Sequence, residues 1–346
     1  MILRSLFESS LIAPLHEYYH VAGAVCSLST NSEFILGAAR GSFTPMAESR
    51  VAADASMRLW VDPSARSGPP WPSAHFRGLN HLVFAAFDAE NTVLVDLRKR
   101  RAVGRLSPAM SADRHYLRRV IFPTLFGIFT ETIAVTPLHC ACVERGGRGL
   151  LLTGASGSGK STLSLALARN CFRFLSDEWT YFSWREGRLR AWGLSTPLKL
   201  LPDAYAHFPE LATMQPTFTM NGELAYEIEP EEIFGVRRSR CAEPDCLILL
   251  ERQDTPGFAL SRLSPVEVAA EFEEDVDFFE AHRLLEGRDL LVRTVRGLGQ
   301  ISCWRLRYGG QPAQVARALV EFLESKDGNG PSGEASQALR AQTDAT

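Results

Sequence analysis

The cysteines of this sequence lack the arrangement that a disulfide framework or a zinc site requires. There are seven of them in 346 residues, an odd number that leaves at least one thiol without an intramolecular partner. None has the paired CxxC spacing of a zinc site. The closest pair, Cys140 and Cys142, fits one face of a strand, where alternate residues point the same way. We therefore expect reduced cysteines, as in a cytoplasmic protein.

The sequence also lacks an excess of charge and a long apolar run. Its 37 lysines and arginines nearly balance 40 aspartates and glutamates, for a net charge of −3, so we expect no nucleic-acid partner. The most apolar stretch, residues 120–129, is far shorter than the roughly 20 residues that cross a bilayer, and the first 15 residues do not resemble a signal peptide. We expect a cytoplasmic protein without a membrane partner.

The chain divides into three predicted parts, and no internal repeat is visible. Residues 1–110 are typical of strands and turns, with a hairpin over 81–103 and a loop rich in proline, serine and glycine over 63–76. Near residue 111 the pattern becomes helical, with Ser111 as a cap and Asp113 in the first turn. Residues 111–325 form the predicted nucleotide-binding domain, and residues 326–346 have too few apolar residues to fold, which predicts a disordered tail.

The predicted nucleotide-binding domain alternates strands and helices, which indicates an α/β fold. The strand sequences are LHCACVE, LLLTG, FRFLSDEWTYFSW and CLILLER, the third of them closing a hairpin with REGRLRAWGL. A short helix follows LLLTG from Ser161, and Asn170 can end it. Two amphipathic helices are predicted over 264–282 and 312–326.

A glycine-rich stretch after the LLLTG strand matches the phosphate-binding pattern GxxxxGK[ST]. Its residues are Gly154, Ala155, Ser156, Gly157, Ser158, Gly159, Lys160, Ser161 and Thr162. The glycines allow the backbone N–H groups to turn toward phosphate oxygens, and the following helix adds a favourable dipole. Lys160 would reach the terminal phosphates, and the Ser161 hydroxyl would bind Mg²⁺. The predicted cofactors are ATP and Mg²⁺.

Two adjacent acids, Asp177 and Glu178, follow the phosphate-binding pattern after only one predicted helix. The strand FRFLSDE can return beside the LLLTG strand and deliver both carboxylates to the phosphates at its C-terminal end. One acid could then hold the metal while the other accepts a proton from an incoming hydroxyl. The alternative is an exposed strand end without a catalytic role.

The stretch LHCACVERGGRGLLLTGASGSGKSTLSLALARNCFRFLSDE, residues 138–178, resembles the catalytic core of the HPr kinase/phosphorylase family. A related arrangement occurs in the ATP-dependent phosphoenolpyruvate carboxykinases. The resemblance implies an α/β core with a P-loop that binds ATP and Mg²⁺ through residues 154–161. It further implies that Asp177 polarises an acceptor hydroxyl, that Glu178 is a metal ligand and that His139 is the active-site histidine. By residue type alone, His139 could instead be a core residue.

This sequence departs from the family pattern at three places. Glu178 stands where the family has a second aspartate, and Cys140 follows His139 where the family usually has glycine. The glycine-containing second signature of the family does not follow the two acids. These departures indicate an HPr-kinase-related enzyme and not the carbon-metabolism regulator itself.

The predicted function is Mg²⁺-ATP-dependent transfer of the γ-phosphate to a hydroxyl. The predicted acceptor is a serine or threonine of a small protein or of a peptide, including a natural-product precursor. Residues 1–110 would recognise it, for instance by pairing an extended peptide with a sheet edge. The partners are thus ATP and a polypeptide, and a homo-oligomer is left open.

Two other functions remain open from the sequence. One is phosphorylation of a small molecule. The other is an ATPase or nucleotide-dependent switch, with Glu251 at the end of CLILLE as the catalytic acid. The neighbour of the LLLTG strand discriminates between them: the strand of Asp177 favours the kinase, whereas CLILLE with a surface Asp177 favours the switch.

Overall fold

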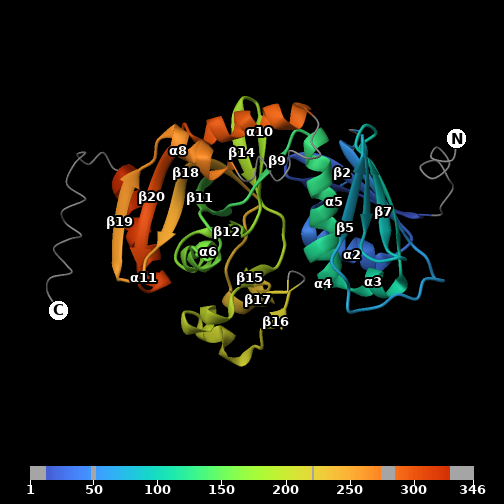
Figure 1. Cartoon of the computed structure of the whole chain (residues 1–346), viewed down its shortest axis with the longest axis horizontal. Helices are drawn as coiled ribbons and strands as arrows, with labels where there is room; N and C mark the ends of the chain where they lie inside the picture. Colours follow the sequence, from blue (N-terminus) through green and yellow to red (C-terminus); the bar gives the residue numbers. More distant parts are fainter. Residues whose placement is uncertain (1–12, 48–51, 220–221, 274–284, 328–346) are drawn as a thin grey trace.

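The computed structural model describes residues 13–47, 52–219, 222–273 and 285–327. This part of the chain is a mixed α/β structure with three β-sheets. Figure 1 shows the sheet of the first hundred residues at one end of the molecule and strands β19 and β20 at the other. Within the described ranges, no helix has the length and apolar character that spanning a membrane would need.

The first sheet has eight strands in the order β3-β1-β2-β4-β8-β7-β6-β5. Strands β2, β4 and β8 are parallel to one another, and the remaining neighbours are antiparallel. The predicted hairpin is present as β6 and β7. The strands are β1 (Leu15–Val21), β2 (Ala24–Thr30), β3 (Thr44–Met46), β4 (Ala55–Val61), β5 (His75–Leu79), β6 (Leu82–Ala86), β7 (Thr92–Asp96) and β8 (Arg101–Leu106).

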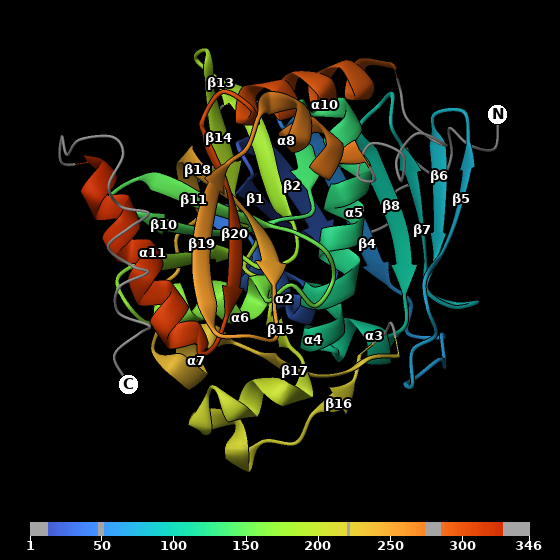
Figure 2. The same cartoon turned by 60° about the vertical axis from the view of Figure 1, so that its left-hand side comes forward.

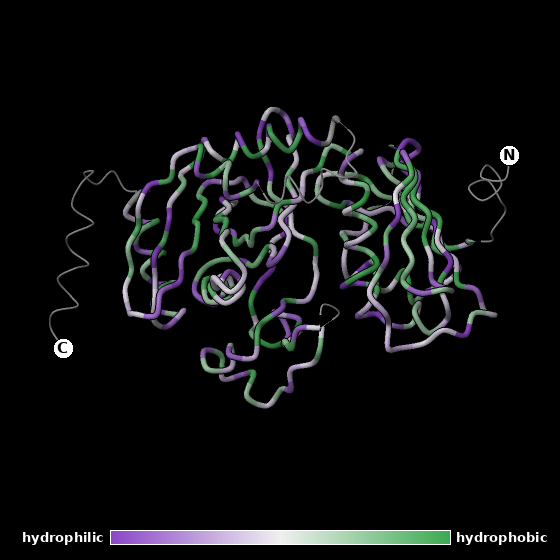
Figure 3. The backbone as a smooth tube through the Cα atoms, viewed as in Figure 1, coloured by the Kyte–Doolittle hydropathy of each residue, from purple (hydrophilic) through white to green (hydrophobic). Residues whose placement is uncertain are grey.

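Helical segments cover one face of this sheet, on the side toward the rest of the chain (Figure 1). The strands are largely hydrophobic (Figure 3), and their inward residues share one core cluster with these segments. Phe122, Phe126 and Phe129 in this cluster are fully buried. The segments are α2 (Glu33–Ser42), α3 (Pro108–Ala112), α4 (Arg114–Tyr116), η1 (Leu117–Ile121), α5 (Phe122–Phe129) and η2 (Thr130–Thr132).

The sequence prediction differs from this region in two ways. Helix α2 interrupts a part that was expected to contain mainly strands and turns. The predicted helix from Ser111 in fact begins at Pro108, because the Ser107 hydroxyl accepts the Met110 N–H, and it breaks at Asp113, which caps a second helix. The core cluster of the first sheet also contains residues up to Val135, which lie beyond the predicted domain boundary at residue 110. The boundary itself stays a prediction.

The second sheet has nine strands, seven of them in the order β12-β10-β11-β18-β14-β13-β9, with β20 and then β19 branching from β18. Strand β18 pairs in parallel with both β11 and β20. The strands are β9 (Thr136–Leu138), β10 (Ala141–Arg145), β11 (Arg148–Thr153), β12 (Arg173–Ser176), β13 (Thr180–Arg185), β14 (Arg188–Trp192), β18 (Cys241–Arg252), β19 (Gly257–Arg262) and β20 (Ser302–Gly309).

The central strands of the second sheet are buried on both faces, as their continuous apolar sequences indicate. Helices α6 (Lys160–Ala168) and α11 (Pro312–Asp327) share one cluster with Leu150 and Leu152, whereas α8 (Pro265–Glu271) and α10 (Leu285–Leu298) share another with Leu151. Figure 2 shows α6 and α11 away from α8 and α10. The predicted helix over 264–282 begins as α8, and its residues 274–282 lie outside the described residues.

A small subdomain joins β14 to β18 and lies below the second sheet in Figure 1. It has its own core cluster, in which Leu165 and Phe174 attach it to α6 and β12. Its elements are β15 (Leu198–Leu200), η3 (Pro202–Ala206), η4 (Pro209–Thr213), β16 (Thr217–Phe218), β17 (Leu224–Ile228) and α7 (Pro230–Phe234). The sequence analysis did not foresee this subdomain.

Candidate functional site

The glycine-rich loop of residues 154–159 joins β11 to α6. Gly154, Gly157 and Gly159 all have positive φ, at +135°, +79° and +92°. Residues other than glycine rarely adopt this region of backbone conformation. Residues 155–157 are exposed at the tip of the loop. The loop therefore presents accessible backbone at the N-terminus of a helix, where the peptide dipoles favour an anion.

Tyr308 of β20 supports the loop from below. Its hydroxyl donates a 2.6 Å hydrogen bond to the Ser158 carbonyl, and a Cβ on Gly159 would lie only 2.2 Å from the same hydroxyl oxygen. Burial raises the pKa of Tyr308, so the hydroxyl remains a donor at neutral pH. Glycine is thus required at residue 159 by a close approach as well as by its φ angle.

Lys160 lies back across the loop. Its Nζ is 2.5 Å from the Gly154 carbonyl oxygen and 3.2 Å from that of Ala155. Burial lowers the pKa of Lys160, while the carboxylates of Asp177 and Glu271 act in the opposite direction. The ammonium group is therefore held at the loop beside two acids, where a polyphosphate could replace its carbonyl partners.

The strand that ends before Asp177 is not the neighbour of β11, so this part of the prediction is wrong. Strand β10 lies between β11 and β12 and is antiparallel to both. It occupies this position because β10 and β11 form a tight hairpin through residues 146 and 147. The predicted strand FRFLSDEWTYFSW is also two strands, β12 and β13, with the acids in the break between them.

The acid pair nevertheless lies at the same edge of the sheet as the loop. Since β10 is antiparallel to both neighbours, β11 and β12 run in the same direction. Cys142 is the register partner of Leu151 on one side and of Ser176 on the other. Asp177 is the next residue, and its charge acts on Lys160 against burial, which lowers the pKa of that lysine.

Asp177 is a buried carboxylate, with a relative exposure of 8%. Burial raises its pKa to about 6, and the charge of Glu178 acts in the same direction, against the backbone N–H of Lys199 and the charge of Arg119. The Lys199 N–H donates to Oδ2 over 3.2 Å. The Ser161 hydroxyl is close enough to favour the ionised form, yet Oδ1 makes no hydrogen bond. A buried acceptor of this kind is rare in folded proteins and marks a place for a ligand or proton.

Glu178 forms an ion pair with the first region of the chain. Its Oε2 is 3.1 Å from Nη2 of Arg119, and Nε of Arg119 is 2.8 Å from Glu227. Arg119 comes from η1 and Glu227 from β17. The guanidinium therefore joins three parts of the structure.

The ion pairs of Glu227 make a testable contribution to acid stability. Burial alone would raise its pKa, but hydrogen bonds and charges from His115 and Arg119 outweigh it and lower the pKa to about 2 from 4.5. The resulting stability is present above pH 4.5 and is lost as the pH falls toward 2. Arg119→Met should therefore lower the free energy of unfolding by about 2 kcal/mol at neutral pH, measured by urea unfolding.

A matched control is Arg145→Met, which removes an exposed 2.9 Å pair with Glu324 and should change stability by less than about 1 kcal/mol. The difference between the two variants should shrink when unfolding is measured at about pH 3, where Glu227 begins to be protonated. An Arg119→Met chain that is as stable as wild type at neutral pH would show that the pair contributes nothing.

A third acid, Glu271, was missed by the sequence analysis. Its Oε1 accepts a 2.7 Å hydrogen bond from the Thr153 hydroxyl at the end of β11, and its charge also acts on Lys160. Glu271 ends α8, more than a hundred residues away in sequence. No local signal could have placed it at the loop.

His139 lies just before β10, and its ring centroid is 5.4 Å from that of Trp179. The neighbouring strand β9 pairs with β13, so residues 138 and 180 are register partners. The histidine is thereby placed next to the residue that follows Glu178. Its role in the reaction stays a prediction.

Glu251, the acid of the alternative function, is engaged elsewhere. Strand β18 does lie beside β11 in parallel, as the switch would require. However, the Glu251 carboxylate pairs with Arg305 and Arg307 of β20, each at 2.8 Å. The two features that were expected to discriminate the kinase from the switch thus disagree. CLILLE is the neighbour of the loop strand, as the switch requires, yet Asp177 is buried, as the kinase requires.

The described residues contain no cluster of three or more histidine, cysteine or acidic side chains arranged for a metal ion. A magnesium ion held by two phosphates needs fewer protein ligands. The Ser161 hydroxyl, which lies close to Asp177, and the carboxylate of Glu178 are oxygen ligands of the kind Mg²⁺ prefers. The residues present fit such an ion.

A hollow lies beside the first turn of α6, and its walls include Thr162, His207, Arg252 and Tyr308. Two of these side chains are aromatic rings and one is a cation. Gly159 of the loop and Pro312 at the start of α11 also line it.

No family model matches this chain, and no curated protein is similar to it. Among solved structures, the HPr(Ser) kinase/phosphatase from Coxiella burnetii is similar over 56% of this chain and 99% of that chain, with 13% sequence identity and a TM-score of 0.29. A likeness at this level carries no weight for fold or function. The interpretation below therefore depends on the site itself.

Proposed function

We propose that this protein is a Mg²⁺-ATP-dependent kinase that transfers the γ-phosphate to a serine or threonine hydroxyl of a small protein or peptide. The observation that carries the proposal is Asp177: a buried carboxylate with a pKa of about 6 and an unpaired oxygen, beside Lys160 at a glycine-rich loop. A general base works best when its pKa lies near the working pH.

The loop and Lys160 bind the phosphates. Backbone N–H groups of the loop and the N-terminus of α6 would meet the anion, except the Ser158 N–H, which donates to the Ala155 carbonyl. Lys160 would exchange its loop carbonyls for phosphate oxygens. The hollow next to Thr162, with its arginine and ring faces, has the chemistry to accept a nucleoside.

Asp177 accepts the proton of the acceptor hydroxyl as that oxygen bonds to the γ-phosphorus. The bond from the γ-phosphorus to the bridging oxygen breaks, and ADP leaves with the electron pair. Positioning and charge stabilisation supply most of the rate in such a reaction. Mg²⁺, held by Ser161 and Glu178, would neutralise charge on the phosphates.

A nucleotide-dependent switch is the second candidate, because β18 lies beside β11. The pairing of Glu251 with Arg305 and Arg307 argues against it, since a carboxylate held by two guanidinium groups is a poor base.

The test is transfer of label from γ-labelled ATP into host-cell extract separated into protein, peptide and small-molecule fractions. We expect label in a polypeptide, with wild type and Glu251→Gln equal within about twofold because Glu251 lies outside the reaction. Label in the small-molecule fraction would indicate the other class of acceptor. Release of free phosphate that Glu251→Gln abolishes, with no labelled acceptor, would establish the switch instead.

A further inference from the structure

We propose that strand β5 and the basic turn between β7 and β8 form a docking site for an extended, acidic segment of a partner polypeptide. The segment would add one more strand to the edge of the first sheet. The inference concerns binding only and does not depend on the nucleotide chemistry proposed above, so the two can fail separately.

Strand β5 is an open edge. It is the last strand of its sheet, and among the described strands it pairs only with β6. All five of its residues are exposed, among them Phe76 at 54% and Leu79 at 70%. Figure 2 shows β5 and β6 at the outer margin of the molecule. An exposed edge with apolar side chains is the template that an extended peptide needs.

The opposite edge of the same sheet is protected. Strand β3 has only three residues, and Pro45 at its centre has no N–H to offer. The hydroxyl of Thr44 in β3 also accepts a hydrogen bond from Arg240 of the second region. The two edges therefore differ: β5 has five residues and no proline, and its one charged side chain is the central Arg77.

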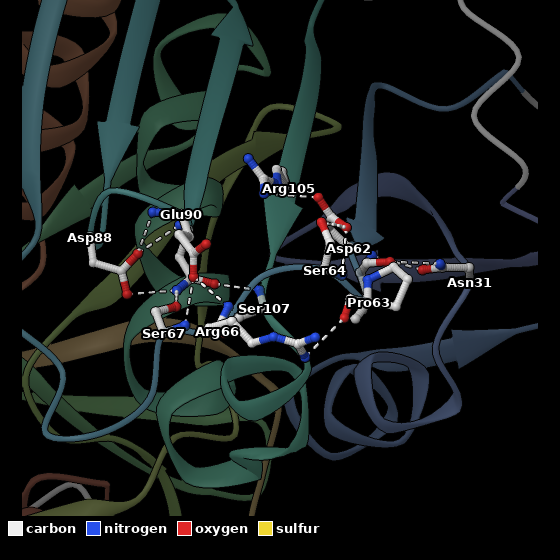
Figure 4. Close-up of polar contacts among 12 residues, drawn as sticks. Asn31, Asp62, Pro63, Ser64, Arg66, Ser67, Asp88, Glu90, Arg105 and Ser107 are labelled. Carbon is white, nitrogen blue, oxygen red and sulfur yellow. Dashed lines mark hydrogen bonds and ion pairs between the residues drawn. The ribbon is translucent and has the colours of Figure 1, made fainter.

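The chain before β5 is held firmly, so the open edge is not a loose end. Trp71 packs against Tyr116 with ring centroids 5.7 Å apart, and its Nε1 donates to Asp113 over 2.8 Å. Farther back, the Glu90 carboxylate accepts the N–H groups of Arg66 and Ser67, both at 2.6 Å (Figure 4). A preorganised edge reduces the entropy that binding must overcome.

The charge around this edge is positive. Arg77 is the central residue of β5, and the turn from Arg98 to Arg101 carries four consecutive basic residues. The Leu97 N–H donates to the His81 carbonyl over 2.8 Å, which fixes this turn beside the turn that ends β5. The nearby acids Asp88 and Glu90 are occupied by backbone N–H groups (Figure 4).

This charge selects an acidic partner over a second copy of the chain. In a symmetric antiparallel pair of β5 strands, the central residue meets its own copy, so Arg77 would lie against Arg77. Like charges directly opposite each other destabilise a strand pair. Arg77, Arg98 and Arg100 also make no ion pair with any described residue, which leaves them available to carboxylates.

The test measures fluorescence anisotropy of a short labelled peptide in which glutamate alternates with valine, against a counterpart with lysine in place of glutamate. We expect wild type to bind the glutamate peptide, more weakly at about 300 mM salt than at about 50 mM. Arg77→Glu should weaken this binding about fivefold and favour the lysine peptide. Arg173→Glu, the same change at an exposed position of β12, should have no effect.

Amide hydrogen exchange checks the mode of binding, because an added strand protects alternate N–H groups of residues 75–79. Binding without this protection, or binding that is equal for both peptides and for Arg77→Glu, would overturn the proposal. So would no binding at all. A wild-type chain that dimerises by light scattering, and becomes monomeric in Leu79→Lys, would assign the edge to a second copy.

Discussion

The Asp177→Asn variant is expected to lose about 10²–10⁴-fold in kcat for phosphotransfer, the usual contribution of a general base. The amide keeps the size of the side chain and can still accept the Lys199 N–H, so the site keeps its shape. It cannot accept a proton from the acceptor. Initial rates with saturating Mg²⁺ and ATP measure the loss.

The same variant should be more stable than wild type at neutral and alkaline pH. Burial raises the pKa of Asp177 from 3.8 to about 6, so the folded chain holds this proton more tightly than the unfolded chain. The stability that the protonated group provides is complete below pH 3.8 and is lost as the pH rises through about 6. Above that, the buried charge costs about 3 kcal/mol, which asparagine avoids.

Two measurements decide the point. Urea unfolding at about pH 8 should favour Asp177→Asn by up to about 3 kcal/mol, and the two proteins should converge near pH 4. In wild type, kcat/KM should rise with pH and level off above about pH 6. A variant that transfers phosphate at the wild-type rate would remove Asp177 from the reaction, whatever its stability.

The Gly193→Ala substitution should both destabilise the protein and lower its activity. A Cβ at residue 193 would lie 1.9 Å from the carbonyl oxygen of Leu175 and 2.7 Å from its carbonyl carbon. Both atoms are backbone, so no side chain can rotate away and β12 must move. We expect a loss of about 3 kcal/mol in the free energy of unfolding. Because Asp177 follows β12 directly, kcat should also fall about 10²-fold.

Gly37→Ala is the matched control. Gly37 is exposed within α2, and a Cβ there meets no atom within 4 Å. Alanine should therefore stabilise the helix by about 0.5–1 kcal/mol and leave phosphotransfer unchanged. Thermal unfolding of both variants tests the pair, and equal stability of Gly193→Ala and Gly37→Ala would show that the close approach to Leu175 is harmless.

Alternating apolar residues and turn residues in the sequence correctly predicted hairpins and the elements around the glycine-rich loop, because neighbouring residues decide whether these form. The hairpins β6–β7 and β13–β14 and the strand, glycine-rich loop and helix around residue 154 are present in the structure. Helix α2 was missed because its signals are weak: the Ser32 side chain caps nothing, and Gly37 lowers its helix propensity.

The remainder depends on contacts between distant residues, which no local pattern contains. The hairpin β10–β11 displaced the expected neighbour of β11, and β18 took the other side. The acids 177 and 178 could be singled out from the sequence, but not the burial of one and the ion pair of the other with Arg119. Glu271 and Tyr308 reach the loop only through the tertiary fold.

The support of the glycine-rich loop has a consequence for biosynthesis. A Cβ on Gly154 would lie 2.7 Å from the Leu250 carbonyl, and Tyr308 holds Ser158 from the strand beyond. A ribosome completes the loop and α6 well before either strand leaves its exit tunnel. The nascent chain therefore contains the loop before it contains β18 and β20, the strands that support it. The shape of the loop, and with it the proposed binding of a nucleotide, would form only in the finished protein.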